Sequence, residues 1–161
     1  MRSHQSQTRD GSIMKRVMIL LPTLDEAEGL TQILPRIPVK KLSKKGWEIE
    51  TLVVDGGSED GTKEIAEKFG CNFMFQRGKG KGAAMRLGFL QFLKSKCDAL
   101  VMFDADGTYH PEEIFKLISK LDHYDVVVGD RLRGAMDPDA MTRLNYFGNH
   151  LLTWIAVALF G

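Results

Sequence analysis

Short apolar runs, each followed by a segment with apolar residues at helical spacing, constrain the fold of this chain more than any other feature. The runs have the length of strands and the segments between them have the length of helices. We expect strands at 17–21, 48–54, 72–75, 99–103 and 125–129, and helices at 26–37, 62–69, 83–93 and 111–121. Strands that alternate with helices at such short range are typical of βαβ units. The sequence therefore predicts an α/β protein with a mostly parallel sheet.

Prolines and lysines indicate where some of these elements end. Pro35 and Pro38 are expected to end the first helix, because proline lacks the backbone N–H that a helix needs. The basic stretch 40–45 that follows is interpreted as a solvated loop. Pro111 stands at the expected first position of the last helix, where proline is well tolerated.

Polar residues cluster directly after four of the predicted strands. These clusters are 22–26, 55–61, 104–110 and 129–133. Ligands of parallel sheets bind outside the carboxyl ends of the strands, near a switch in strand order. We therefore expect the four clusters to form one shared site.

The most informative cluster contains Asp104 and Asp106, separated by Ala105, at the end of a strand. In an extended chain, successive side chains alternate between two sides, so both carboxylates lie on one side and Ala105 on the other. Two carboxylates are suitable ligands for Mg²⁺ or Mn²⁺, with substrate phosphates and water completing the coordination. The alternative is a turn at Asp106 and Gly107 that Asp104 caps.

Two further clusters allow both a ligand and a structural explanation. Asp55 ends its strand and can accept a hydrogen bond from a base or ribose, or it can form an Asx-turn. Lys79, Lys81 and Arg86 accompany three glycines before the helix predicted from Ala83. A helix N-terminus with basic neighbours favours an anion, although a flexible basic loop is equally compatible with this pattern.

Three arginines are candidates for binding phosphate. Arg131 and Arg133 follow the last predicted strand, and Arg143 comes ten residues after the second of them. Guanidinium groups bind phosphate through paired hydrogen bonds. Solvated loop charges are the alternative explanation.

Composition and missing motifs give little support to several classes of function. The net charge of +1 gives no electrostatic case for a nucleic-acid partner. No P-loop motif is present, and the loop 78–82 does not match the dinucleotide-binding fingerprint. Cys71 and Cys97 lack the spacing of metal or redox sites and suit a reducing compartment.

The two ends of the chain differ from the rest. Residues 1–13 are polar and do not resemble a signal peptide, so we expect a tail outside the domain. Residues 151–160 are almost entirely apolar but too few to cross a bilayer, which takes roughly 20. We expect the chain to be a C-terminally truncated fragment.

Five segments together resemble a known family. LLPTLDEAEGL, VVDGGSEDGT, GKGKGAAMRLGF, MFDADGTYHPEEI and VVGDRLRG occur in this order. They closely resemble the family 2 glycosyltransferases with the GT-A fold, and within them the dolichyl-phosphate (polyprenyl-phosphate) mannose and glucose synthases. The resemblance covers Arg16–Phe160. It implies a three-layer α/β/α, Rossmann-like nucleotide-sugar-binding domain at 14–144, followed at 145–161 by the start of a membrane-facing or acceptor-side apolar helix.

The resemblance also implies roles for individual residues. Asp104, Asp106 and Arg131 would be catalytic. Arg131 and Arg143 would bind the phosphate of the acceptor. Mg²⁺ or Mn²⁺ would be held by Asp104 and Asp106, with Thr108 as a further ligand. The donor would contact Pro22, Thr23, Leu24, Glu26, Asp55, Gly82 and Ala105.

The implied activity is metal-dependent transfer of a sugar, with inversion, from a GDP- or UDP-linked donor to a polyprenyl (dolichyl) phosphate. Such an acceptor phosphate is largely dianionic at neutral pH, so it needs no general base. The enzyme would work at the cytoplasmic face of the membrane, peripherally or anchored by a part beyond this chain. GDP-mannose, UDP-glucose and UDP-N-acetylhexosamine all remain open as donors.

One residue and the chain length depart from the family pattern. The mannose synthases often have glutamine where this chain has Thr108, which leaves the donor sugar open. The family's catalytic domain normally continues further, so this chain is also compatible with donor binding without turnover. A saccharide acceptor is a further alternative.

Two unrelated classes fit less well. A nucleotidyltransferase usually has a glycine-rich basic loop after the first strand, where this chain has the acidic PTLDEAEG. A phosphoryl-accepting receiver domain would place its acidic pair after the first strand rather than the fourth.

Overall fold

The computed structural model describes residues 14–129 together with Trp154 and Ala158. The chain divides into two compact units, Met1–His123 and Tyr124–Gly161. Trp154 and Ala158 are helical. The predicted tail at 1–13, the arginines 131, 133 and 143, and the rest of 145–161 lie outside the described residues.

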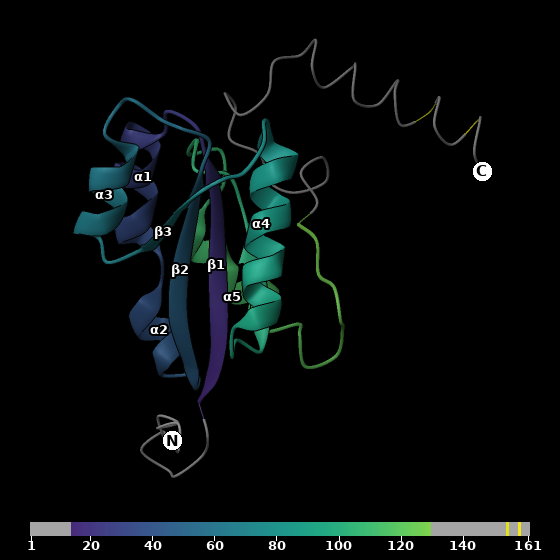
Figure 1. The fold of residues 1–161 in the computed structure, drawn as a ribbon. Coiled ribbons are helices and arrows are strands. Elements are labelled where there is room, and N and C mark those ends of the chain that lie inside the picture. Colours follow the sequence, from purple (N-terminus) through teal and green to yellow (C-terminus); the bar gives the residue numbers. More distant parts are fainter. Residues whose placement is uncertain (1–13, 130–153, 155–157, 159–161) are drawn as a thin grey trace, which may run out of the picture. The chain divides into compact units, whose positions relative to one another are not determined.

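A parallel sheet forms the centre of the first unit (Figure 1). In the described residues four strands pair in the order β3-β2-β1-β4, and every pairing is parallel. They are β1 (Lys15–Thr23), β2 (Trp47–Asp55), β3 (Asn72–Phe75) and β4 (Ala99–Met102). The chain moves outward in one direction from β1 to β3 and then returns to pair β4 with the other edge of β1. This reversal of strand order confirms the predicted α/β architecture and creates a switch point between β1 and β4.

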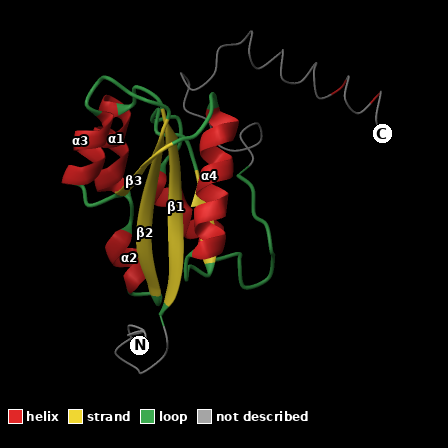
Figure 2. Ribbon diagram, in the orientation of Figure 1, coloured by secondary structure: helices red, strands yellow, loops and turns green. Residues whose placement is uncertain are grey.

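Helices cover both faces of the sheet, as Figure 2 shows. They are α1 (Ala27–Ile33), η1 (Leu34–Arg36), α2 (Val39–Ser43), α3 (Thr62–Lys68), α4 (Lys81–Lys94), η2 (Pro111–Glu113) and α5 (Ile114–Ile118). Buried residues of α1, α2, α3 and α5 pack on one face, whereas α4 packs on the other. The three layers that the family resemblance implied are therefore present in the described residues.

Strand β1 explains why the sequence shows unbroken apolar runs. Val17, Ile19 and Leu21 belong to the core on one face of the sheet, and Met18 and Leu20 belong to the core on the other. All five side chains are fully buried. A central strand of a parallel sheet is covered on both faces, so apolar residues do not alternate with polar ones along it.

Two predicted segments have a different local structure. The stretch 40–45, expected to be a solvated loop, includes most of helix α2, because Leu42 is fully buried in the core. The helix predicted at 26–37 ends at Ile33 and continues as the 3₁₀ turn η1, which contains Pro35. Proline cannot donate the hydrogen bond that would continue an α-helix.

The strand predicted at 125–129 is absent. This stretch has no regular secondary structure, and Val126 and Val128 are 78% and 83% exposed. Valine-rich sequence favours a strand only where a neighbouring strand and a core are available. None of the described strands pairs with this stretch, so the prediction was wrong.

Candidate functional site

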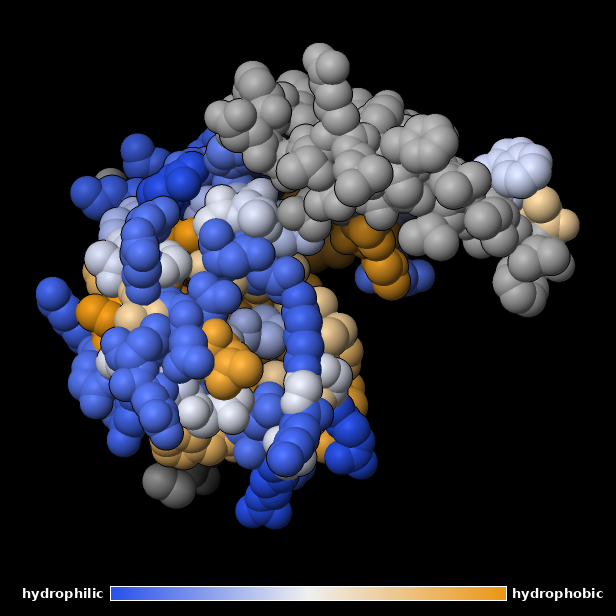
Figure 3. Space-filling view, turned by 90° about the horizontal axis from the view of Figure 1, so that it is seen from above, coloured by the Kyte–Doolittle hydropathy of each residue, from blue (hydrophilic) through white to orange (hydrophobic). Residues whose placement is uncertain are grey.

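A pocket of about 310 Å³ opens at the carboxyl ends of the strands. Loops after all four strands contribute to it, together with the first turn of α4. Its lining consists of Pro22, Thr23, Leu24, Glu26, Gly56, Gln76, Gly80, Lys81, Ala84, Asp104, Ala105 and Asp106. Figure 3 views the molecule from this end, where hydrophilic side chains predominate among the coloured residues and apolar ones form small patches. The clusters after β1, β2 and β4 thus line one pocket, and most of the fourth predicted cluster, 129–133, lies outside the described residues.

Asp104 and Asp106 both line this pocket, at the end of β4. Ala105 between them is almost fully buried, with 1% of its surface exposed. The backbone carbonyl of Ala105 lies against helix α1 at Gly29, where an added Cβ would come within 2.0 Å of the oxygen. The loop that carries the two carboxylates therefore rests directly on α1.

A tight turn holds the Asp106 carboxylate. The backbone N–H and the hydroxyl of Thr108 donate to its Oδ1 at 2.9 and 2.6 Å. Gly107 between them has a φ of +78°, a conformation that glycine adopts without strain. Thr108 thus orients Asp106 in this structure, and its predicted role as a metal ligand stays a prediction.

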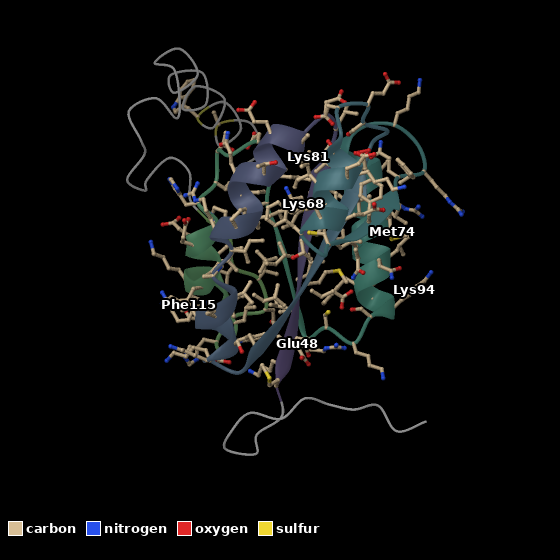
Figure 4. All side chains as sticks on the ribbon, turned by 90° about the vertical axis from the view of Figure 1, so that its left-hand side faces the viewer. Glu48, Lys68, Met74, Lys81, Lys94 and Phe115 are labelled. Carbon is tan, nitrogen blue, oxygen red and sulfur yellow. The ribbon has the colours of Figure 1, made fainter. Side chains whose placement is uncertain are left out.

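Lys81 supplies positive charge at the same place. It is the first residue of α4, and its ammonium group forms an ion pair with Oδ1 of Asp104. Figure 4 labels Lys81 near the end of the sheet that carries the pocket. The sequence was compatible with either an anion site or a flexible loop here, and the structure places Lys81, though not Gly82, in the pocket lining.

Glu26 concentrates further negative charge in the pocket. Burial raises the pKa of its carboxyl group, and the charges of Asp106 and then Asp104 raise that pKa further. Three carboxylates of one pocket thus affect one another, and among them only Asp104 has an ion pair with a lysine. This concentration of negative charge favours a bound cation in the pocket.

The number of possible protein ligands is small. In residues 14–129, no group of three or more His, Cys, Asp or Glu side chains is arranged to hold a metal ion. Mg²⁺ and related ions are commonly held by one or two carboxylates, with phosphate oxygens and water completing the shell. Asp104 and Asp106 fit that kind of site, in which a bound diphosphate contributes ligands.

Asp55 organises the turn after β2. Its carboxylate is 1% exposed and accepts hydrogen bonds from the backbone N–H of Gly57 at 2.8 Å and of Ser58 at 2.7 Å. The hydroxyls of Ser58 and Thr23 donate to its Oδ1 at 2.5 and 3.3 Å. These bonds match the Asx-turn explanation, and direct contact of Asp55 with a nucleoside stays a prediction.

The loop between β1 and α1 is held in an uncommon conformation. Asp25 has a φ of +54°, which few residues other than glycine adopt. Its backbone N–H donates to Oγ of Ser58 at 2.7 Å, and its Oδ1 accepts from the N–H of Glu59 at 3.1 Å. Because Leu24 and Glu26 flank Asp25, these bonds fix two residues of the pocket wall.

The start of helix α1 is attached to the same neighbouring loop. The N–H of Glu26 donates to the hydroxyl of Thr62 at 2.9 Å, and the N–H of Ala27 donates to Asp60 Oδ2 at 2.9 Å. Hydrogen bonds from the Thr62 hydroxyl and then the Ala27 N–H lower the pKa of Asp60. Side chains of the loop after β2 and of the first residue of α3 thus cap α1.

Gln76 is a pocket residue that the sequence reasoning missed. It follows the edge strand β3, and its N–H donates to the carbonyl of Asp55 at 2.8 Å. Its side-chain amide donates to the carbonyl of Gly78 at 3.2 Å. The rule that ligands bind at strand ends could have identified it, but β3 was weak in the sequence and its end was not considered.

Comparison with known proteins identifies the family. The family model described as "Glycosyl transferase family 2" matches residues 18–156. The chain therefore belongs to glycosyl transferase family 2, which confirms the resemblance seen in the sequence.

Two curated relatives illustrate the similarity. Glycosyltransferase AglJ of Haloferax volcanii is 39% identical over 137 residues, which cover 84% of this chain and 42% of AglJ. Polyprenol monophosphomannose synthase of Mycolicibacterium smegmatis is 33% identical over 125 residues, or 73% of this chain and 45% of that protein. The chain thus spans less than half the length of each relative.

A solved structure supports the fold. Glucosyl-3-phosphoglycerate synthase from Mycobacterium tuberculosis, in complex with Mn²⁺ and UDP-glucose, aligns with a TM-score of 0.53 and 22% identity. The alignment covers 66% of this chain and 39% of that one. At this level of identity the likeness establishes a shared GT-A-like fold.

Proposed function

We propose that this chain carries the donor-binding part of a glycosyltransferase that transfers a sugar from a nucleotide diphosphate to a polyprenyl phosphate. The observation that carries the proposal is the pocket at the switch point. There Asp104, Asp106 and Lys81 meet the loops after β1, β2 and β3.

The width of the sheet suits a nucleoside diphosphate. Gln76 follows β3 and Asp104 follows β4, which are three strand positions apart in the order β3-β2-β1-β4. Strands lie about 4.8 Å apart, so these two pocket residues are separated by about 14 Å across the sheet. A nucleoside diphosphate of similar length would place its base beside Gln76, Gly56 and Leu24 and its diphosphate beside Asp104 and Lys81. The predicted contacts of Pro22, Thr23, Glu26 and Ala105 fit the space between these two ends, because these residues also line the pocket.

Asp104 and Asp106 would hold Mg²⁺ or Mn²⁺, with Thr108 keeping Asp106 oriented. The ion would supply charge neutralisation of the leaving diphosphate. Lys81 would move its ammonium group from Asp104 to the diphosphate oxygens. Because Lys81 is the first residue of α4, the N-terminus of this helix would also favour the anion.

The acceptor is proposed from the named relative and from chemistry. A relative with 33% identity is named polyprenol monophosphomannose synthase, which indicates a polyprenyl phosphate as the acceptor of that protein. A phosphate monoester is largely dianionic at neutral pH and can attack without a general base. Direct attack would invert the anomeric centre. We propose Arg131 and Arg143, which lie outside the described residues, to hold the acceptor phosphate.

A lipid acceptor implies work at a membrane surface, and we propose its cytoplasmic face. In the described part of the chain, no helix combines the length and apolar character needed to cross a bilayer. The alternatives of a saccharide acceptor and of donor binding without turnover share the same donor pocket, so the donor is the first part to test.

Thermal unfolding with GDP-mannose, UDP-glucose and UDP-N-acetylglucosamine, each with and without Mn²⁺, tests the donor pocket. A ligand that binds only the folded state raises Tm according to its occupancy. We expect one donor to raise Tm strongly and only when Mn²⁺ is present. The variant Asp106→Asn should lower that affinity on the order of tenfold or more, because it removes one of two charged ligands.

Asp122→Asn is the matched control, since Asp122 is an exposed carboxylate paired with Lys15 outside the pocket lining. It should bind the donor as the wild type does. Equal donor affinity in Asp106→Asn and wild type would refute the assignment of the acidic pair.

A further inference from the structure

Helix α4 is apolar on two opposite faces. Its inner face packs on the sheet through Ala84 and Gly88, and an added Cβ at Gly88 would come within 2.4 Å of the Leu20 side chain. Its outer face carries three apolar side chains that lie on one side of the helix. They are Phe89, Leu90 and Leu93, with 40%, 39% and 76% of their surface exposed. A surface helix of a globular domain is normally polar on its outer face.

Positive charge surrounds this outer face. Between residues 77 and 96 the sequence contains cations and no aspartate or glutamate. All of the cations are exposed, namely Arg77, Lys79, Lys81, Arg86, Lys94 and Lys96. Arg86 lies three and four residues before Phe89 and Leu90, so it shares their side of the helix. Lys81 and Lys94 are the first and last residues of α4, and both are labelled in Figure 4.

This local charge is large for a chain whose net charge is +1. Of these six cations, only Lys81 forms an ion pair with a carboxylate of the described residues. The core of a protein–protein interface is typically depleted in charge. Apolar residues flanked by cations of a single sign are instead typical of helices that lie on anionic membranes.

We propose that the outer face of α4, comprising Phe89, Leu90 and Leu93 with the flanking cations, docks on the surface of a bilayer that contains anionic lipids. The apolar side chains would enter the headgroup region, and Arg86, Lys94 and Lys96 would contact the lipid phosphates. Helix α4 would lie along the membrane plane, with its inner face still packed on the sheet.

Docking through α4 would also place the donor pocket beside the headgroups, an inference that rests on the proposed function. Gly80, Lys81 and Ala84, at the N-terminal end of α4, line that pocket. A helix of 14 residues is about 21 Å long, so the pocket lies within one helix length of every docked residue. A lipid-linked phosphate could then reach the site without leaving the bilayer.

Vesicle co-sedimentation of the full chain tests the proposal. The lipids are phosphatidylcholine alone and phosphatidylcholine mixed with phosphatidylglycerol. We expect binding to the anionic vesicles that weakens when salt is raised from about 0.1 M to about 0.5 M, because screening reduces surface attraction. The triple variant Phe89→Ser, Leu90→Ser, Leu93→Ser and the triple variant Arg86→Gln, Lys94→Gln, Lys96→Gln should each bind on the order of tenfold more weakly.

The double variant Val39→Ser, Phe69→Ser is the matched control, because it removes exposed apolar side chains that are not on α4. It should bind as the wild type does. Circular dichroism and thermal unfolding confirm that each variant is folded, and the gain in Tm with nucleotide and Mn²⁺, measured without vesicles, reports the donor pocket separately.

Three outcomes would overturn the proposal. The first is an absence of binding by the wild type, and the second is unchanged binding by the folded α4 variants. The third is that the wild type does not bind vesicles but self-associates, and that the apolar triple variant abolishes this self-association. This result would assign the outer face of α4 to contact with a second copy of the chain. None of these outcomes would affect the assignment of the donor pocket. That assignment fails only if nucleotide and Mn²⁺ do not raise Tm.

Discussion

At the scale of single residues, Ser58 connects the two loops that shape the pocket. Its hydroxyl accepts from the N–H of Asp25 at 2.7 Å and donates to Asp55 at 2.5 Å. We expect Ser58→Ala to lower the free energy of unfolding by about 1 kcal/mol, the typical contribution of such a bond. It should also weaken donor binding several-fold, because Asp25 keeps its strained φ of +54° only where its neighbours hold it.

Ser95→Ala provides the comparison for that prediction. The Ser95 hydroxyl, like that of Ser58, takes part in two hydrogen bonds. It donates to the carbonyl of Phe92 at 2.7 Å and accepts from the N–H of Cys97 at 3.1 Å. It lies just after the C-terminal end of α4, away from the pocket lining. Chemical denaturation and donor titration should show a similar stability loss in both variants and an affinity loss only in Ser58→Ala. Unchanged affinity in Ser58→Ala would show that the pocket does not depend on this junction.

The acidic residues at the strand ends differ in how much of their environment the sequence alone predicts. The strand-end positions of Asp55, Asp104 and Asp106 were identifiable from the sequence, because apolar runs fix where strands end. The hydrogen-bond partners of each carboxylate were not, since they depend on how neighbouring loops fold. Asp55 is enclosed by N–H and hydroxyl donors, whereas Asp104 and Asp106 line the pocket.

At the scale of elements, helix α1 supports the acidic loop through Gly29. An added Cβ there would meet the Ala105 carbonyl oxygen at 2.0 Å. Gly29→Ala should therefore displace the loop of Asp104 and Asp106, lower stability by roughly 1–3 kcal/mol through overpacking, and reduce Mn²⁺-dependent donor affinity. Thermal unfolding with and without donor and Mn²⁺ measures both effects.

Gly88→Ala separates crowding of the core from displacement of the loop. Its added Cβ would come within 2.4 Å of the buried Leu20 side chain, which is not part of the pocket lining. Both substitutions also gain the same helix propensity. We expect Gly88→Ala to lower Tm without a selective loss of donor affinity. If both variants lose donor affinity equally, loose helix packing rather than the acidic loop controls binding.

The strands were more predictable from the sequence than the short helices. Burial on both faces gives β1 and β2 apolar runs that are visible without any structure. Helix α2 has five residues, of which only Leu42 is buried and two are lysines, so its local pattern resembles a loop. The stretch 125–129 has the opposite character, because its valines favour a strand and yet no described strand pairs with it. Pairing depends on residues distant in sequence, which a local pattern does not contain.

At the scale of the whole described unit, the two faces of the sheet are unequally built. Sixteen buried residues form the core beneath α1, α2, α3 and α5, but only five form the core beneath α4. Less buried apolar area therefore holds α4 on the sheet than holds the helices on the opposite face. This difference agrees with a role for α4 at an interface, where an outer surface can add the missing burial.

The two thiols allow the larger core to be examined separately, since Cys71 packs against it and Cys97 packs against the smaller one. Burial raises the pKa of Cys71 from 9.0 to about 11. The folded state thus binds this proton more tightly than the unfolded state does, so the stability linked to it is complete below pH 9 and is lost as pH rises toward 11. We expect Tm to fall more steeply over that range in the wild type than in Cys71→Ser, because lysines and tyrosines titrate alike in both.

The alkylation rate of Cys71 in a Cys97→Ser background should likewise keep rising above pH 9, since the thiolate is the reacting form. Parallel Tm curves together with a rate that levels off near pH 9 would mean that Cys71 is solvated and that the larger core is open at this point.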